Sequence, residues 1–136
     1  MPIIRVLIVD DFEPMRRSVR SMLEEWVDVQ VVGEASDGLE AVRKAVELKP
    51  DLVLMDIGLP LQNGIEAARQ IFDLVSEIKI LFLSQEPSAE VIQEALGLGA
   101  SGYVVKVNAG IDLLPAIKAL ISGRQFVSSR SQPSIP

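Results

Sequence analysis

The sequence contains neither cysteine nor histidine among its 136 residues. The absence of cysteine excludes disulfide bonds, thiolate metal sites and cysteine nucleophiles. The absence of histidine excludes serine–histidine–aspartate hydrolysis, histidine general bases and the usual zinc sites. Any catalytic or metal-binding chemistry therefore depends on carboxylates, lysine, hydroxyl groups and the backbone.

Positive charge is also scarce, with 13 lysines and arginines against 19 aspartates and glutamates, and the formal net charge is −6. Binding to nucleic acid depends heavily on cationic contacts with phosphate, so we expect this domain itself to contact no nucleic acid. No apolar run reaches the roughly 20 residues that a membrane span needs, and the N-terminus lacks the basic region and cleavage site of a signal peptide. We therefore expect no membrane association and a cytoplasmic location.

Short apolar segments and helical patterns alternate five times along the chain, of which 49% is hydrophobic. The predicted strands are 3–9, 27–33, 52–55, 78–83 and 102–105. The predicted helices follow them at 14–26, 39–48, 65–75, 88–98 and 111–121, the fourth with Ser88 as its N-cap. This alternation predicts one α/β domain whose parallel sheet is covered by helices on both faces. We expect residues 1–124 to form it and the polar residues 125–136 to be a linker or a disordered tail.

Four of the predicted strands end in polar residues that an apolar core cannot hold. Asp10 and Asp11 follow the first strand, Asp56 the third, Ser84 the fourth and Lys106 the fifth. Ligands bind outside the carboxyl ends of the strands in an open parallel sheet, so these side chains would face one crevice. Each position alone has an ordinary explanation, as a helix cap, a turn residue or a solvated lysine. It is their coincidence that indicates a site.

Three carboxylates a few ångströms apart repel one another, and a hard divalent cation would neutralise them. Oxygen ligands suit Mg²⁺, which usually shares its coordination shell with a phosphate. A lysine and a hydroxyl opposite the acids would then hold phosphate oxygens, and one carboxylate could act as a nucleophile. Asp56 is the best candidate because it stands alone after its strand, whereas Asp10 and Asp11 form a pair suited to holding metal.

Several segments together resemble a response-regulator receiver domain (CheY-like), closest to receivers of the NarL/FixJ class. They are LIVDD at 7–11, LVLMDIGLP at 52–60, NG at 63–64, FLS at 82–84 and GASGYVVK at 99–106. The resemblance covers roughly residues 3–123. It implies a flavodoxin-like (βα)5 fold with a five-stranded parallel sheet of order 2-1-3-4-5. It also implies two-component signalling, in which Asp56 accepts a phosphoryl group from a sensor histidine kinase.

The resemblance also implies how Mg²⁺ would be held beside Asp56. Asp11 would bind the cation directly, and Asp10 would help largely through water. The acceptor Asp56 and the backbone carbonyl of Gly58 would complete the protein ligands. The loop beside the acceptor would be shaped by Pro60 and Gly64.

By the same resemblance, Lys106 would hold a phosphoryl oxygen and Ser84 would move toward the phosphoryl group. Tyr103 would turn inward as the switch aromatic, although it could instead be a half-exposed strand residue. The surface of residues 88–122 would then change and control an output such as transcription. The domain is expected to assist its own phosphorylation and dephosphorylation without being an enzyme in the ordinary sense.

Three departures from the family pattern affect these expectations. Val107 follows Lys106 where many receivers have a proline, and Gln85 follows Ser84 where a small residue is usual. The long Gln85 side chain could narrow access to the acceptor for small phosphodonors. Gly58 and Glu86 occupy positions that tune dephosphorylation in relatives, and neither is an obvious residue for orienting water. We therefore expect slow self-hydrolysis.

Other functions stay open from the sequence. The chain could be a stand-alone receiver, a pseudo-receiver that only docks partners, or an aspartyl-phosphate phosphatase. Phosphatases of that type require two acids spaced D-x-D on one strand. The run at 97–102 matches G-x-G-x-x-G but precedes a strand, which disfavours nucleotide binding. A C-terminal DNA-binding domain missing from this chain and a phosphorylation-dependent homodimer also stay open.

Overall fold

The computed structural model describes residues 3–85, 89–99 and 102–128. All strands in this part form one parallel sheet of order β2-β1-β3-β4-β5-β6. The strands are β1 (Ile4–Val9), β2 (Val29–Ala35), β3 (Leu52–Asp56), β4 (Lys79–Ser84), β5 (Gly102–Val105) and β6 (Phe126–Val127). The helices are α1 (Glu13–Glu24), α2 (Gly38–Leu48), α3 (Gly64–Leu74), α4 (Ala89–Gly97) and α5 (Ala109–Ile121), with a 3-10 helix over Lys106–Asn108.

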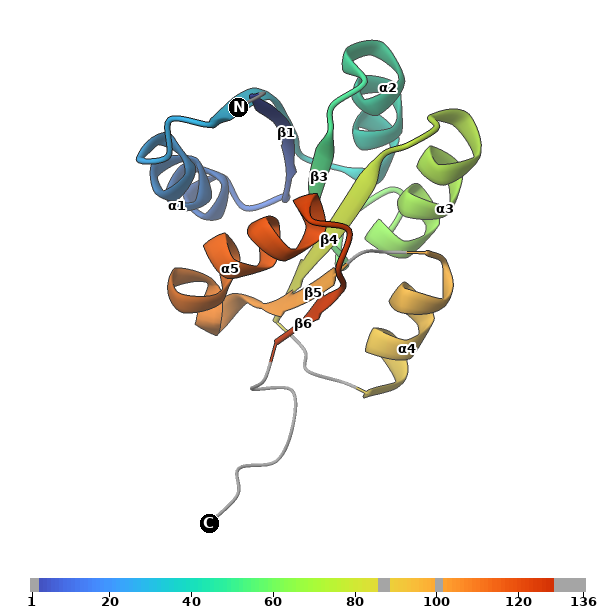
Figure 1. The fold of residues 1–136 in the computed structure, drawn as a ribbon. Coiled ribbons are helices and arrows are strands. Elements are labelled where there is room, and N and C mark those ends of the chain that lie inside the picture. Colours follow the sequence, from blue (N-terminus) through green and yellow to red (C-terminus); the bar gives the residue numbers. More distant parts are fainter. Residues whose placement is uncertain (1–2, 86–88, 100–101, 129–136) are drawn as a thin grey trace.

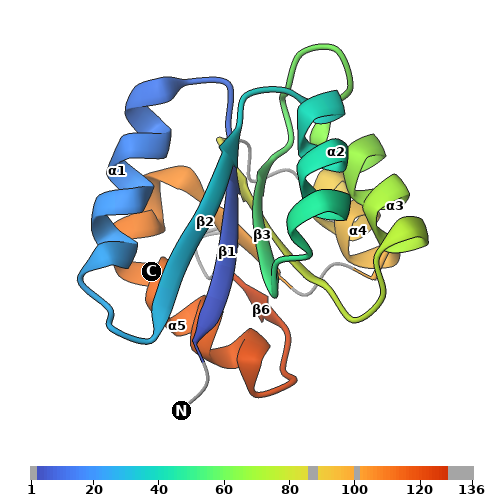
Figure 2. The same ribbon diagram turned by 90° about the horizontal axis from the view of Figure 1, so that it is seen from above.

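The helices lie in two layers. Helices α1 and α5 cover one face of the sheet, and α2, α3 and α4 cover the other (Figures 1 and 2). Each face has its own apolar core, and every residue of the central strand β3 is buried. Strands that are covered on both faces need continuous apolar sequence, which explains the run LVLM before Asp56. The predicted flavodoxin-like fold and the order of its first five strands are confirmed.

Local sequence signals account for several helix starts. Asp37 caps α2 by accepting a hydrogen bond from the backbone N–H of Glu40, and Asn63 caps α3 through Glu66 in the same way. Pro14 lies in the first turn of α1, where its missing N–H removes no helical hydrogen bond. The alternative role of Asp11 as the cap of this helix is wrong, because Phe12 occupies the N-cap position.

The structure corrects two boundaries between α1 and β2. The helix ends at Glu24, so Trp26 is not helical, and β2 begins at Val29 rather than at Val27. Val27 lies in the turn and is 86% exposed. An apolar residue in a turn resembles a strand residue by pattern alone, which explains the error.

A sixth strand lies where the sequence suggested a tail. Phe126 and Val127 pair with β5, and the backbone N–H of the buried Ser128 donates to the carbonyl of Tyr103. The Ser128 hydroxyl donates to Asp112 on α5. Residues 126–128 are therefore packed on the domain, while 129–136 lie outside the described residues. The predicted Ser88 cap and part of the run at 97–102 also lie outside them.

Candidate functional site

The carboxyl ends of β1 and β3 bring three acids together. Asp10 and Asp11 follow β1 directly, and Asp56 is the last residue of β3, its neighbour in the sheet. One carboxylate oxygen from each of the three lies within 4.8 Å of the others. Asp10 and Asp56 are buried, whereas Asp11 is exposed. The strand-end acids thus converge at one edge of the sheet, as their positions in the sequence predict.

Lys106 reaches this cluster from the end of β5. Its ammonium Nζ lies 2.7 Å from Oδ2 of Asp10 and 3.4 Å from Oδ1 of Asp56. The other oxygen of Asp10 accepts a hydrogen bond from the backbone N–H of Phe12 at 2.9 Å. The lysine side chain is only 13% exposed, so water screens these contacts less than it screens surface ion pairs.

Burial and nearby charges shift the pKa values of two groups in the cluster, Asp56 and Lys106. Burial of the Asp56 carboxylate raises its pKa, and the negative charge of Asp10 adds to this, although Lys106 opposes it. For Lys106, burial favours the neutral amine, but the hydrogen bond to Asp10 and the charges of Asp56 and Asp10 outweigh it and raise its pKa. The site therefore holds a charged lysine beside an acid whose ionised form is disfavoured.

A cavity of about 750 Å³ opens onto these groups. Ser84, buried at the end of β4, lines it together with Asp56 and Lys106. Gln85, the exposed Val107 and Gly58 also line it, so three of the four residues that depart from the family pattern lie at the site. The fourth, Glu86, lies outside the described residues.

Tyr103 lies on β5 but does not reach the described lining of the cavity. Its side chain is completely buried in the apolar core beneath α2, α3 and α4, a core that also contains Phe82 and Ile92. The alternative of a half-exposed strand residue is therefore wrong. The side chain already lies inside the core in this structure, and its role as a switch aromatic stays a prediction.

The loop after Asp56 depends on a close backbone approach. A Cβ on Gly64 would lie 2.1 Å from the carbonyl oxygen of Asp56, so only glycine fits here. The backbone N–H of Gly64 donates to Ile57 at 2.8 Å and closes the loop. Gly58 has open space around its Cβ position, and its N–H donates to Oδ1 of Asp56 at 3.4 Å.

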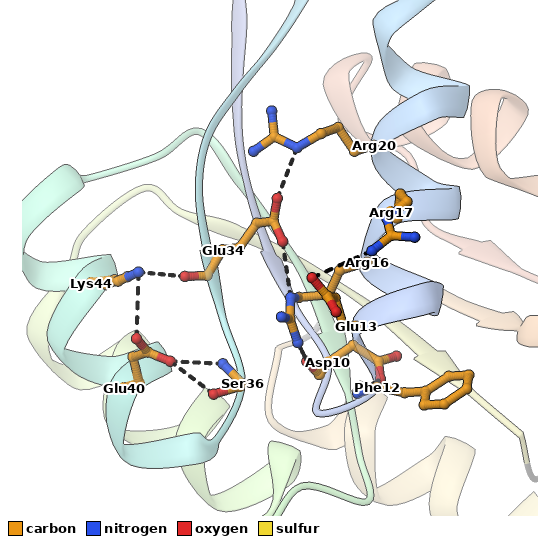
Figure 3. Close-up of polar contacts among 10 residues, drawn as sticks. All are labelled: Asp10, Phe12, Glu13, Arg16, Arg17, Arg20, Glu34, Ser36, Glu40 and Lys44. Atoms are coloured by element: carbon orange, nitrogen blue, oxygen red, sulfur yellow. Dashed lines mark hydrogen bonds and ion pairs between the residues drawn. The ribbon is translucent and has the colours of Figure 1, made fainter.

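One side-chain network at the site was missed by the sequence reasoning. Arg16 on α1 donates through Nη1 to the backbone carbonyl of Asp10 at 2.7 Å and through Nε to Glu34 of β2 at 2.9 Å. Arg20 donates to the other oxygen of Glu34 at 2.8 Å, as Figure 3 shows. Burial raises the pKa of Glu34, but the hydrogen bonds and charges of Arg20 and Arg16 outweigh it and lower the pKa. Spacing along the sequence gives no signal for this pairing.

The side chains at the cluster could hold a metal ion. The three carboxylates supply oxygen ligands, and Lys106 offsets only part of their charge. Like charges held this close repel one another unless a cation or a proton neutralises them. Oxygen ligands without nitrogen or sulfur match a hard cation such as Mg²⁺.

Comparison with known proteins identifies this arrangement. Residues 6–118 match the family model of the response regulator receiver domain. The chain belongs to the response regulator receiver family. This membership explains the acidic cluster, because receivers generally bind Mg²⁺, and the strand order is that of the family's shared fold. Receivers work with sensor kinases in two-component systems.

The relatives place this chain with the receivers of the NarL/FixJ class. The transcriptional regulatory protein LiaR of Bacillus subtilis is 39% identical over 127 residues, which are 93% of this chain and 60% of LiaR. A LuxR-family response regulator from Aurantimonas sp. SI85-9A1 is 36% identical with a TM-score of 0.90, and 95% of this chain and 92% of that one are covered. The receiver domain of NarL from Mycobacterium tuberculosis has a TM-score of 0.84 at 28% identity, with 91% of this chain and all of that one covered.

This receiver spans about 60% of the length of its curated relative LiaR. Within the described ranges of the receiver, no helix is both long and apolar enough to cross a membrane.

Proposed function

We propose that this receiver is a phosphorylatable switch in which Asp56 accepts a phosphoryl group from a sensor histidine kinase. The observation that supports it is the convergence of Asp10, Asp11, Asp56 and Lys106 at the mouth of one cavity. A module that only docked partners would have no need for a buried acid beside a buried lysine, because both groups lose hydration there.

In the proposed reaction, a carboxylate oxygen of Asp56 attacks the phosphorus of the donor. The new oxygen–phosphorus bond replaces the phosphorus–nitrogen bond of the kinase phosphohistidine, and the electron pair leaves with the imidazole nitrogen. Lys106 is placed to hold one phosphoryl oxygen, because its Nζ already lies 3.4 Å from the Asp56 carboxylate. The buried hydroxyl of Ser84 is proposed to bind a second phosphoryl oxygen.

Asp10, Asp11 and Asp56, with the backbone carbonyl of Gly58, are the proposed ligands of Mg²⁺. When bound, this cation supplies positive charge that offsets the charge developing on the transferring phosphoryl group. The backbone N–H of Phe12 orients the Asp10 carboxylate through one oxygen, while Lys106 pairs with the other. The same residues are proposed to assist slow hydrolysis of the phosphoaspartate.

Phosphorylation would change the charge at the cavity and so the partners of Ser84 and Lys106. A phosphoryl group adds about −1.5 to −2 charges and three acceptor oxygens. Movement of Ser84 at the end of β4 would be felt by β5, its hydrogen-bonded neighbour, and by Tyr103 on that strand. We propose that the surface of α4, β5 and α5 changes with it and controls transcription by a longer regulator.

The deciding experiment incubates the protein with Mg²⁺ and either a phosphorylated histidine kinase or a small acyl-phosphate donor. Intact-mass measurement should show one phosphoryl group on the wild-type chain and none on Asp56→Asn. The matched control is Asp73→Asn, which changes an exposed acid on α3 and should label normally. No labelling by either donor would indicate a pseudo-receiver, and rapid repeated release of phosphate would indicate a phosphatase.

A further inference from the structure

The turn that holds Asp10 and Asp11 is tied to the neighbouring strand β2 by its backbone. The N–H of Asp10 donates to the carbonyl of Ala35 at 3.0 Å. Its own carbonyl accepts from Nη1 of Arg16 at 2.7 Å, and the same guanidinium binds Glu34, the residue next to Ala35. Both polar groups of the Asp10 backbone are therefore fixed against the end of β2, one directly and one through Arg16.

Glu34 is itself held firmly by its neighbours. Its second carboxylate oxygen accepts from Arg20, and its backbone carbonyl accepts from Lys44 of α2, as drawn in Figure 3. The carboxylate thus anchors Arg16 in one orientation, with its side chain only 17% exposed. A planar guanidinium can bind a carboxylate and a carbonyl at once, which an ammonium cannot do in the same geometry.

We propose that Arg16 is a positioning residue for the Mg²⁺ site: by joining the Asp10 carbonyl to Glu34, it holds the Asp10–Asp11 turn in the geometry that the cation needs. This inference rests on the proposed function, because it concerns the same metal site. Arg16 makes its hydrogen bond to the backbone carbonyl of Asp10 and not to the carboxylate of a proposed Mg²⁺ ligand. It therefore acts on the backbone from which the Asp10 and Asp11 side chains project.

The direction in which Mg²⁺ affinity changes when Arg16 is replaced separates this proposal from a simple charge effect. A positive side chain near a cation site repels the cation, so removal of the charge alone would strengthen Mg²⁺ binding. Loss of a positioning contact would weaken it instead. Partners that orient metal ligands typically contribute about 10- to 100-fold in metal affinity when they are removed.

The test measures the Mg²⁺ dissociation constant of the whole chain by isothermal titration calorimetry. Arg16→Gln should weaken binding by about tenfold. Arg16→Lys should also weaken it, although the charge is kept, because an ammonium cannot replace the two-sided contact. The matched control is Arg17→Gln, which removes a charge from the next position of α1. The Arg17 side chain is 70% exposed and pairs only with Glu13 among the described residues. It should stay within about twofold of wild type.

Urea unfolding in EDTA, run on the same variants, separates positioning from a purely structural role. If Arg16→Gln lowers stability but binds Mg²⁺ as tightly as wild type or more tightly, the inference is overturned. Wild-type affinity in Arg16→Lys would overturn it too, because Mg²⁺ binding would then not need the two-sided contact that an ammonium cannot make. If the wild-type chain itself binds no Mg²⁺, the proposed function fails, and this inference fails with it. Wild-type binding with an unaffected Arg16→Gln variant removes the inference alone.

Discussion

Lys106 lies closer to Asp10 than to Asp56, with Nζ 2.7 Å from the first carboxylate and 3.4 Å from the second. The positive charge of Lys106 therefore offsets the negative charge of Asp10, a proposed metal ligand, more than that of Asp56, the proposed acceptor. A cation that binds Asp10 must compete with this ion pair, whereas a phosphoryl group on Asp56 would draw the lysine away from it. Binding of the cation and phosphorylation of Asp56 would thus favour each other.

Replacement of Lys106 should strengthen metal binding to the unphosphorylated protein. Lys106→Met frees the Asp10 carboxylate and removes a positive charge beside the three acids, so we expect the Mg²⁺ dissociation constant to fall several-fold in calorimetry. The control is Lys118→Met, which removes a lysine of α5 whose ammonium lies 5.5 Å from the centre of the Trp26 ring. Weaker Mg²⁺ binding by Lys106→Met would contradict this account of the ion pair.

The buried carboxylate of Asp56 should destabilise the metal-free protein at neutral pH. The pKa of Asp56 is raised from its ordinary value of 3.8, so its ionised form is disfavoured in the folded state. Asp56→Asn removes that penalty, and we expect a higher free energy of unfolding in urea at pH 7 with EDTA present. The advantage should shrink as pH falls through the raised pKa, because the wild-type carboxyl then becomes neutral and wild-type stability gains.

Measurements of both proteins from pH 7 down to pH 4 test the sign of this effect. Asp73→Asn, which changes an exposed acid on α3, again serves as the matched control. A less stable Asp56→Asn protein at pH 7 would mean that attraction to Lys106 outweighs burial.

Two glycines of the loop after Asp56 should respond differently to alanine. A Cβ at Gly64 would lie 2.1 Å from the Asp56 carbonyl and 2.8 Å from Cα of Ile57, so the backbone must shift. Overpacking of this kind costs about 1–3 kcal/mol, which urea unfolding resolves. Gly58→Ala meets nothing within 4 Å and should change stability by less than about 0.5 kcal/mol. Equal losses in both variants would argue against the close approach as the cause.

Gln85 should limit access of small phosphodonors to the acceptor. It is exposed at the edge of the cavity that contains Asp56 and Ser84. Gln85→Ala removes its long side chain, and we expect faster labelling of Asp56 by a small acyl phosphate, measured by intact mass at several times. Labelling by the phosphorylated kinase should change less, because the kinase presents its phosphohistidine on a protein surface. An unchanged rate with the small donor would exclude Gln85 as a barrier.

The sequence predicted the parts of the site that follow from strand periodicity. Asp56 and Lys106 end apolar strands, and parallel pairing necessarily brings such ends to one edge. The contact of Arg16 with Glu34 could not be predicted in this way, because it depends on the packing of α1 against β2 and on side-chain rotamers. Strand β6 was missed because two residues are too few to show a periodic pattern.

Strand β6 also changes which backbone groups are exposed to other molecules at this edge of the sheet. An outermost strand normally presents unpaired backbone groups to which a strand of another chain can add. Here Phe126 and Val127 cover β5, and Ser128 takes the carbonyl of Tyr103. Gly102 permits this contact, since a Cβ there would lie 2.9 Å from the carbonyl oxygen of Phe126. The short final strand therefore occupies the outer edge of β5 along Gly102 and Tyr103, where a strand of another chain could otherwise pair.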